Sequence, residues 1–312
     1  SPAYPLSVAV HTPGRMKKAA EPEGGEYLEI AFPHGSGNIM MGFSQQADEA
    51  KVLARTGADE AIAEVQAHYD ELFKNRIDTP ENVLDEAFQS ALVTLEYTYR
   101  YPYGWMECIH HWLSMWHMQA GGCAPYIGQT DRAWNCLWSH AENLTPEGGV
   151  PNLGPGGHVH RDFGGSNQFY SWQINEFWKY TADKEAARKL APILDKIINQ
   201  TYQEYDPDGN LLLAWGQQIG NQEDYVSTPY DGTSPSIEGI RMLTTRANLA
   251  RALDDEDTAR QCEDKADLIL SRLREKLWQQ DLGRFAFFMD PQGIIRPDGQ
   301  YHTYIYPALW NL

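Results

Sequence analysis

From residue 46 onward, apolar residues recur three and four positions apart, which is the spacing of side chains on one face of an α-helix. This periodicity predicts that residues 46–312 form a mainly helical domain. Helices are expected over 46–74, from Thr79 through Leu95, over 167–180 and 183–205, from Ser236 onward, and over 256–277. Thr79 and Pro80 are a typical N-cap and first helical residue.

The connections between these helices are of two kinds. Asp254–Glu256 is a short turn, whereas Cys123–Ser166 and Leu213–Pro235 are long and rich in Gly, Pro and aromatic residues. Long loops on a helical scaffold are usually functional. The alternation predicts a ring of helical hairpins, with short turns on one rim and a cleft built from long loops on the other. A helical solenoid is the alternative, but it would show a fixed repeat period, which this sequence lacks.

Residues 1–45 differ from the rest of the chain. Ser7–Val10 and Glu26–Phe32 have the apolar pattern of strands and are separated by Gly- and Pro-rich turns. Two strands do not make an independently stable sheet. We therefore interpret residues 1–45 as an N-terminal β segment, either the remnant of a β-sandwich or an arm, ahead of the helical domain.

Composition excludes several classes of function. A net charge of -18 argues against binding to nucleic acid and to anionic membranes, and no apolar stretch is long enough to span a bilayer. The four cysteines lack the CxxC spacing of zinc and redox motifs, so no metal or other cofactor is expected. The chain begins at Ser1 rather than Met, so an upstream segment is expected to be missing. A periplasmic or secreted location is favoured over the cytoplasm.

Aromatic residues are abundant: the chain has 10 Trp and 17 Tyr. Aromatic rings stack on the apolar faces of sugars, although packing in a large core is the commoner role for any single Trp. The abundance is consistent with a carbohydrate substrate.

Four segments resemble parts of the six-hairpin glycosidases, especially glycoside hydrolase family 63 and the trehalase-like enzymes. Residues 77–88 resemble the helix that opens the toroid, and 277–293 resemble a hairpin that follows an inner helix. Residues 125–134 are similar to the loop that presents a sugar-binding Asp, although Gln129 and Thr130 depart from its motif. Residues 215–225 lie where these enzymes place the loop with their catalytic acid.

The resemblance implies an (α/α)₆ toroid that acts as an O-glycosyl hydrolase with two carboxylates. The predicted helices are fewer than a closed toroid requires, so the catalytic domain at 46–312 is expected to be truncated at its C-terminus. The catalytic base of such enzymes lies nearer the C-terminus, and it is expected beyond Leu312, in a missing segment that would complete the toroid.

Glu223 and Asp224 are the candidate catalytic residues. Glycoside hydrolysis needs one carboxylic acid to protonate the leaving oxygen and one carboxylate to activate water or attack carbon. The two are adjacent in a long loop beside Trp215, Tyr225 and Tyr230, and both charge repulsion and an aromatic wall raise a carboxyl pKa. We expect one of them to be the general acid. The alternative is a solvated acidic turn.

Asp131 is the candidate ligand for the sugar in the −1 position, with Arg132 and Trp134 beside it. A buried Asp can accept hydrogen bonds from two sugar hydroxyls. The equally weighted alternative is an N-cap of the helix that carries Trp134 and Trp138. The other expected substrate-binding residues are Trp215, Gln222, Tyr225, Tyr230, His158 and His160.

His158 and His160 alternate as in some metal sites, but a third ligand is not evident, so a substrate-contacting loop is favoured.

Two other functions compete with hydrolysis. A toroidal polysaccharide lyase or a sugar epimerase would use these histidines with Tyr170 and Asn167, although the acidic charge weighs against a lyase that binds uronates. A noncatalytic glycan-binding module is the third possibility.

Overall fold

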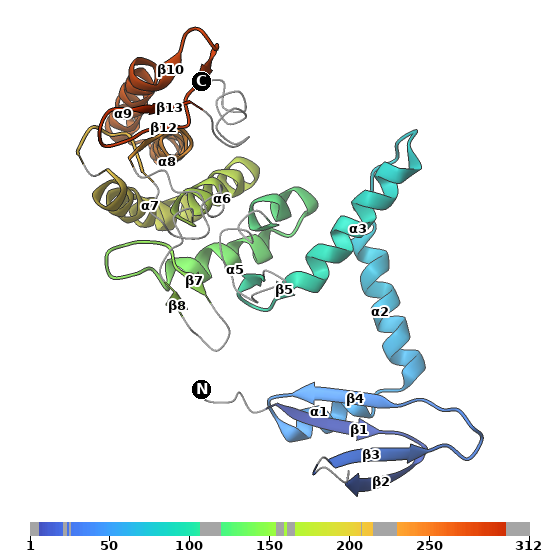
Figure 1. The fold of residues 1–312 in the computed structure, drawn as a ribbon. Coiled ribbons are helices and arrows are strands. Elements are labelled where there is room, and N and C mark those ends of the chain that lie inside the picture. Colours follow the sequence, from blue (N-terminus) through green and yellow to red (C-terminus); the bar gives the residue numbers. More distant parts are fainter. Residues whose placement is uncertain are drawn as a thin grey trace. The chain divides into compact units, whose positions relative to one another are not determined.

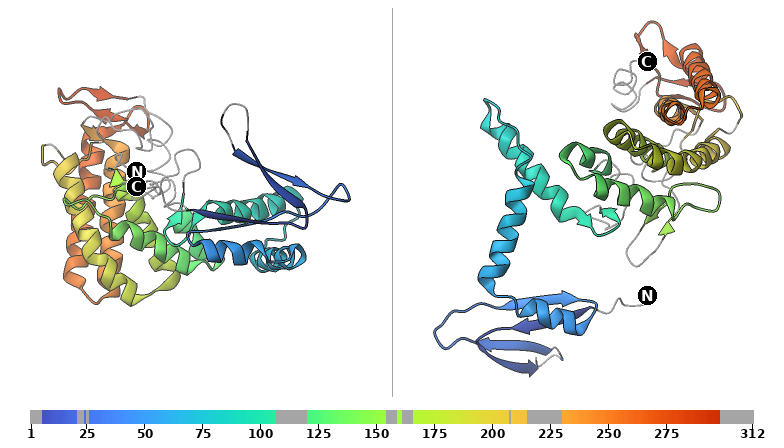
Figure 2. Two further views of the ribbon diagram at one scale, coloured as in Figure 1. Left: turned by 90° about the horizontal axis from the view of Figure 1, so that it is seen from below. Right: turned by 180° about the vertical axis from the view of Figure 1, so that it is seen from behind.

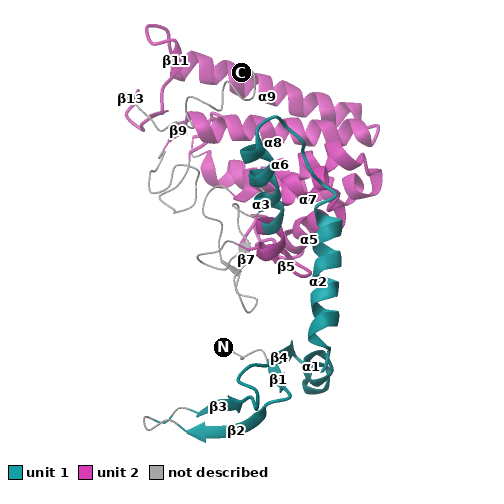
Figure 3. Cartoon of the chain, turned by 90° about the vertical axis from the view of Figure 1, so that its right-hand side faces the viewer, with its two compact units in different colours: residues 1–93 teal, residues 94–312 magenta. Residues whose placement is uncertain are grey.

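The computed structural model describes residues 6–20, 24, 26–106, 120–153, 159–160, 166–206, 208–214 and 230–297, with the backbone alone at 152–153 and 159–160. The chain divides into two compact units, residues 1–93 and 94–312 (Figure 3). The described residues are mainly helical with short strands, as the periodicity predicted (Figure 1). The (α/α)₆ toroid stays a prediction.

The first unit contains two antiparallel strand pairs, β1 with β4 and β2 with β3. Their bounds are Ser7–His11 (β1), Arg15–Ala20 (β2), Glu26–Ala31 (β3) and Met40–Ser44 (β4). Helix α1 (Ala47–Ala54) packs on β1 and β4. A Cβ at Gly42 of β4 would lie 2.0 Å from the carbonyl oxygen of Ala50, so only glycine allows this close approach. Helix α2 (Ala58–Leu72) follows.

Helix α3 (Asn82–Thr98) spans the boundary between the units and begins later than the sequence predicted. Thr79 does not cap it. The Thr79 hydroxyl accepts a hydrogen bond from the Glu81 amide and donates to Asp85. The Thr79–Pro80 pair therefore forms a turn that the Asp85 side chain holds ahead of the helix.

The second unit is built from long helices and very short strands. Its helices are η1 (a 3₁₀ turn, Ala124–Ile127), α5 (Thr130–Ala141), α6 (Ser166–Thr181), α7 (Lys184–Tyr205), α8 (Thr233–Ala252) and α9 (Glu256–Leu277). Its strands are β5 (Tyr99–Arg100), β6 (Gly104–Trp105), β7 (Asn152–Leu153), β8 (Val159–His160), β9 (Asp231–Gly232), β10 (Trp278–Gln279), β11 (Arg284–Phe285), β12 (Phe288–Met289) and β13 (Ile295–Arg296). The helix axes are roughly aligned (Figure 2).

Consecutive helices of this unit run antiparallel. Tyr170 of α6 donates a hydrogen bond to the Leu137 carbonyl of α5, and Phe177 lies further along α6 against Trp134, which lies earlier in α5. Helices α7 and α8 are also antiparallel. Asp195 of α7 pairs with Arg246 of α8, and Tyr202, further along α7, approaches Gly239, which lies earlier in α8. The helical hairpins that the unequal connections predicted are therefore present.

Helices α6 and α8 are parallel neighbours. Arg241 of α8 donates to the Gln168 carbonyl of α6 at 3.4 Å, and Asn248 donates to Asn175 at 3.2 Å. Between the first contact and the second, the residue number rises by seven on both helices, from 241 to 248 on α8 and from 168 to 175 on α6. The two helices therefore point the same way. Their N-terminal ends consequently lie at the same end of the unit.

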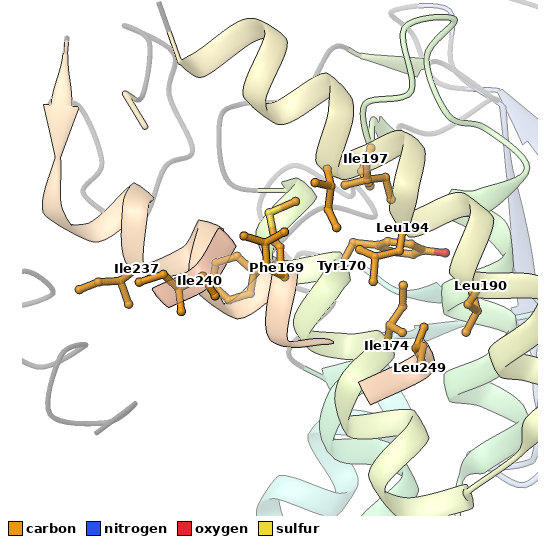
Figure 4. Packing of buried hydrophobic residues seen from close by; sticks show 14 of the residues in the cluster. Phe169, Tyr170, Ile174, Leu190, Leu194, Ile197, Ile237, Ile240 and Leu249 are labelled. Atoms are coloured by element: carbon orange, nitrogen blue, oxygen red, sulfur yellow. The ribbon is translucent and has the colours of Figure 1, made fainter. Parts of the chain in front are cut away.

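The core of the unit lies among α6, α7 and α8 (Figure 4). Helix α7 is amphipathic and contributes Leu190, Leu194 and Ile197 to it. Helices α6 and α8 are buried on nearly every side over 166–177 and 233–243. They nevertheless carry many polar residues, which is unusual because helices buried all round are normally apolar. The polar positions of these two helices thus need an explanation.

Candidate functional site

Residues 142–165 precede α6 and residues 206–232 precede α8, and we call these segments the two long connections. The predicted connection Cys123–Ser166 was too long, because η1 and α5 lie within it, and the predicted connection Leu213–Pro235 overlaps the start of α8 at Thr233. The Gly232 amide donates to the Leu213 carbonyl at 2.9 Å, and the Leu213 amide donates to Ser236 of α8 at 2.8 Å. The chain therefore enters and leaves residues 215–229 beside the first turn of α8. We name this end of the unit, at the N-termini of α6 and α8, the rim.

Asn167 fixes the entry into α6. Its side-chain oxygen accepts from the Val150 amide at 2.8 Å, and its side-chain nitrogen donates to Gln200 at 2.6 Å and Thr201 at 2.7 Å of α7. Asn167 is fully buried. This network ties the connection before α6 to the hairpin formed by α6 and α7, and it gives the rim a rigid base.

Glu238, in the second turn of α8, is a fully buried carboxylate. It forms an ion pair with Arg241, one turn along the same helix. Burial raises the pKa of Glu238 because desolvation penalises the charged form, although Arg241 partly opposes this shift. The neutral form is therefore favoured more than in an exposed glutamate.

Apart from this ion pair, several buried side-chain atoms of α6 and α8 lack hydrogen-bond partners within the described part of the chain. They include both carboxylate oxygens of Glu238, both amide atoms of the Gln168 side chain and the hydroxyl of Ser171. Buried polar groups are almost always hydrogen-bonded, because leaving one unpaired costs about 1–3 kcal/mol. Such a concentration on two adjacent helices is typical of a functional site.

A groove of about 250 Å³ lies between α6 and α8. We name it the α6–α8 groove, and it is lined by Asn175, Lys179, Ile237, Ile240, Arg241, Thr244, Thr245 and Asn248. The residues from α8 recur three and four positions apart, so they share one face of the helix. Six of the eight are polar, and Arg241 connects this face to the buried Glu238.

Tyr230 lies at the rim, immediately before β9 (Asp231–Gly232). Its hydroxyl donates to Asp208 at 3.1 Å, and this hydrogen bond raises the pKa of Tyr230. The neighbouring Asp231 is fully buried and accepts from Asn210 at 2.8 Å and Lys276 at 3.0 Å. These contacts fix the start of α8 and place Tyr230 at the rim.

Asp131, Arg132 and Trp134 lie elsewhere, in the first turns of α5. Asp131 is not the N-cap, which is Gln129. Because α5 runs antiparallel to α6, this position is at the C-terminal end of α6. The 16 residues of α6 span roughly 24 Å at about 1.5 Å per residue. The structure therefore does not bring these three residues together with Tyr230.

Arg132 has structural partners. Its guanidinium donates to both Glu96 carboxylate oxygens, at 2.7 and 2.8 Å, and lies 4.5 Å from the centre of the Tyr99 ring. Trp134 stacks on Trp138. Asp131 and Trp134 also line a pocket of about 350 Å³ with Lys189 and residues at the start of α7.

The remaining sequence-predicted residues lie outside the described residues. They are Glu223, Asp224, Trp215, Gln222, Tyr225 and His158, and His160 is described by its backbone in β8 alone. Within the described ranges, no group of three His, Cys, Asp or Glu residues could hold a metal ion, and no helix is long and apolar enough to cross a membrane.

Tyr170 and Asn167, which a lyase or epimerase would use, are committed to the core. Burial raises the pKa of Tyr170, and its hydroxyl donates to the Leu137 carbonyl at 2.8 Å. Asn167 is occupied by Val150, Gln200 and Thr201. Neither side chain is available as an acid or base in this arrangement.

Sequence reasoning missed Glu238, Arg241 and Gln168. A Glu and an Arg three residues apart on a helix usually form an exposed ion pair. The available signal was their position within 234–243, a stretch in which small and apolar residues surround a single acid and a single base.

Comparison with known proteins identifies the fold. No protein-family model and no curated protein matches the chain. The family 78 rhamnosidase of Bacillus sp. GL1 matches with a TM-score of 0.51 and 16% identity, over 64% of this chain and 21% of its own. The family 63 mannosylglycerate hydrolase of Thermus thermophilus matches with a TM-score of 0.54 and 13% identity, over 68% of this chain and 70% of its own.

The fold is shared with glycoside hydrolases. The glycosidase-like fold that the motifs predicted is supported at this level. The chain spans about a fifth of the length of the Bacillus rhamnosidase.

Proposed function

We propose that this chain is a catalytic part of a glycoside hydrolase and that its substrate binds at the rim. The observation that carries the proposal is the parallel packing of α6 and α8, which joins both long connections and the buried Glu238 at one end of a glycosidase-like fold. Active sites are concave regions with convergent polar groups and perturbed pKa values.

One residue of the pair Glu223 and Asp224 is proposed as the general acid. The hydrogen bonds of Leu213 and Gly232 at the start of α8 support this, because these described residues, which flank the segment that carries the pair in the sequence, lie at the rim. The acid protonates the leaving oxygen, and a second carboxylate activates water or attacks the anomeric carbon. Tyr230 belongs to the same region through its hydrogen bond to Asp208.

The experiment is an incubation of the protein with aryl glycosides and with natural oligosaccharides. Release of reducing sugar, without the ultraviolet absorbance of an unsaturated product, would support hydrolysis. The matched control is the double variant Glu223→Gln with Asp224→Asn, which should release no sugar from the natural substrates. An unsaturated product would show a lyase, and glycan binding without product would show a binding module; either result would overturn the proposal.

A further inference from the structure

A second pocket lies at the opposite end of α6 from the rim. Its volume is about 350 Å³, and Phe177 and Thr181 line it from the last turns of α6. The rest of the lining comes from the start of α5, including Asp131 and Trp134, and from the start of α7, including Lys189. We name it the α5–α7 pocket. The rim residues described above do not line it, so its role is separate from the proposed hydrolysis.

Trp134 gives the α5–α7 pocket an aromatic wall of fixed orientation. Its ring stacks on Trp138, one turn further along α5, with the ring centres 5.4 Å apart and 16° between the ring planes. The ring of Phe177 lies 5.8 Å from that of Trp134. Trp134 is half-buried, so part of it stays open to the pocket that it lines. A ring that is already fixed stacks on the apolar face of a sugar with little loss of side-chain entropy.

Two of the acids that line the pocket are already engaged. Asp183 caps α7 by accepting from the Glu185 and Ala186 amides, at 2.8 and 3.1 Å. Glu185 forms an ion pair with Arg188, one turn along α7. These contacts fix the first turn of α7, so this wall of the pocket is rigid. They leave the remaining acid, Asp131, as the acceptor for a ligand.

Asp131 and Lys189 are the polar side chains that are available beside Trp134. Both are exposed, and neither side chain has a hydrogen bond or ion pair with another described residue. The ammonium of Lys189 instead lies 5.5 Å from the centre of the Trp134 ring and 5.8 Å from that of Trp138. Cation–π contacts at exposed sites are weak, so a ligand oxygen replaces this contact without a large loss. The pocket thus presents one acceptor and one donor next to an aromatic ring.

The charges around the pocket select the class of ligand. Three acids and one lysine line it, which disfavours an anion. A cation from solution would displace Lys189 from the ring and leave the ammonium facing a like charge. A neutral sugar also takes the place of Lys189 on the ring, but its hydroxyls accept hydrogen bonds from the ammonium, so the lysine keeps a partner. Other hydroxyls of the sugar donate to Asp131.

We propose that the α5–α7 pocket is a second saccharide-binding site, which holds one neutral sugar residue of a glycan apart from the site of hydrolysis. Trp134 stacks on the sugar ring, Asp131 accepts from its hydroxyls and Lys189 donates to them. The volume of about 350 Å³ is at the small end of the range of about 300–1,000 Å³ for ligand pockets, which suits a single sugar residue. The inference goes beyond the proposed function, because this site takes no part in the chemistry and only retains the glycan.

The test follows the Trp134 side chain itself by NMR in the intact protein. The indole nitrogens of tryptophan are isotope-labelled, and the Trp134 signal is the one that disappears in Trp134→Phe. The probes are neutral tetrasaccharides of glucose, mannose, galactose and xylose, with choline as a cation and inorganic phosphate as an anion. We expect at least one tetrasaccharide to shift the Trp134 signal saturably, and choline and phosphate to leave it in place.

Two variants assign the binding to the pocket. Asp131→Ala and Lys189→Ala should each weaken saccharide binding by about tenfold, because each removes a charge-assisted hydrogen bond. Both side chains are exposed, so neither substitution should unfold the protein, and circular dichroism establishes that each variant is folded. The matched control is Lys196→Ala, since Lys196 is an exposed lysine two turns further along α7 that does not line the pocket.

Three results would overturn the inference: a Trp134 signal that no tetrasaccharide shifts, saccharide binding that is unchanged in folded Asp131→Ala and Lys189→Ala, or choline bound more tightly than every tetrasaccharide. Hydrolysis is measured separately. Turnover of glycosides without a shift of the Trp134 signal would overturn the inference and leave the glycosidase proposal standing. A saccharide-induced shift in a protein that hydrolyses no glycoside would do the reverse.

Discussion

Asn248 of α8 donates a 3.2 Å hydrogen bond to Asn175 of α6, seven residues further along each helix than the contact of Arg241 with Gln168. Two helices from separate hairpins are thereby held parallel and in register. The consequence is functional, because parallel helices bring the connections that precede them to the same end of the fold. The candidate site follows from this packing.

The first prediction separates the two candidate acids. Glu223→Gln and Asp224→Asn are assayed individually on a natural glycoside and on an aryl glycoside. Loss of a general acid costs about 10²–10⁴ in rate, but it costs less when the leaving group is good and needs no proton. One variant should lose turnover of the natural substrate and keep much of its aryl-glycoside activity. Wild-type rates in both variants on the natural substrate would exclude both residues as the acid.

The second prediction concerns Asp131, whose role as the sugar ligand in the −1 position stays a prediction from the sequence. Its position at the start of α5, near the C-terminal end of α6, leads us to expect that Asp131→Asn keeps kcat/KM for an aryl glycoside within about threefold of wild type. A matched assay of Asp183→Asn, in the same pocket, controls for general effects there. A large rise in KM confined to Asp131→Asn would instead support the role in the −1 position.

The third prediction concerns stability. Asn167→Ala removes hydrogen bonds to Val150, Gln200 and Thr201 and leaves buried partners unpaired, so it should lower the free energy of unfolding by about 2–4 kcal/mol. Asn199→Ala, an exposed position on α7, should change it by less than about 0.5 kcal/mol. Urea denaturation followed by circular dichroism measures both. Equal effects of the two substitutions would contradict the buried network.

The fourth prediction concerns pH. Burial raises the folded-state pKa of Glu238, so the folded protein binds this proton more tightly than the unfolded chain does. Its contribution to stability is therefore most favourable at low pH. It is lost as pH rises from the ordinary glutamate pKa of about 4.3 through the raised folded value.

Glu238→Gln removes this titration. The stability of the wild type relative to Glu238→Gln should fall as pH rises over that window, and thermal melts at a series of pH values would measure it. The control pair is wild type against Glu185→Gln, an exposed acid with the same spacing to its arginine, which should show no such trend. A wild-type advantage over Glu238→Gln that grows with pH would show that Arg241 outweighs desolvation.

Local features of this protein could be predicted from the sequence because their causes are local. The apolar spacing over 256–277 predicted α9 with the bounds that the structure shows, and the helix predicted from Asp183 begins one residue later because Asp183 is its N-cap. Hydrogen bonding within a turn and the periodicity of side chains need no distant partner. The glycosidase-like fold also followed from short segments of sequence.

Tertiary packing decided where the candidate residues lie. Asp131 and Tyr230 were both assigned to the cleft by their loops, yet the antiparallel course of α5 against α6 places Asp131 at the far end of the hairpin from Tyr230. The Glu238–Arg241 pair has the spacing of an exposed ion pair, and only the parallel packing of α6 and α8 buries the acid and turns the arginine toward a groove. Burial and helix direction depend on partners from distant parts of the chain, so periodicity along one helix does not encode them.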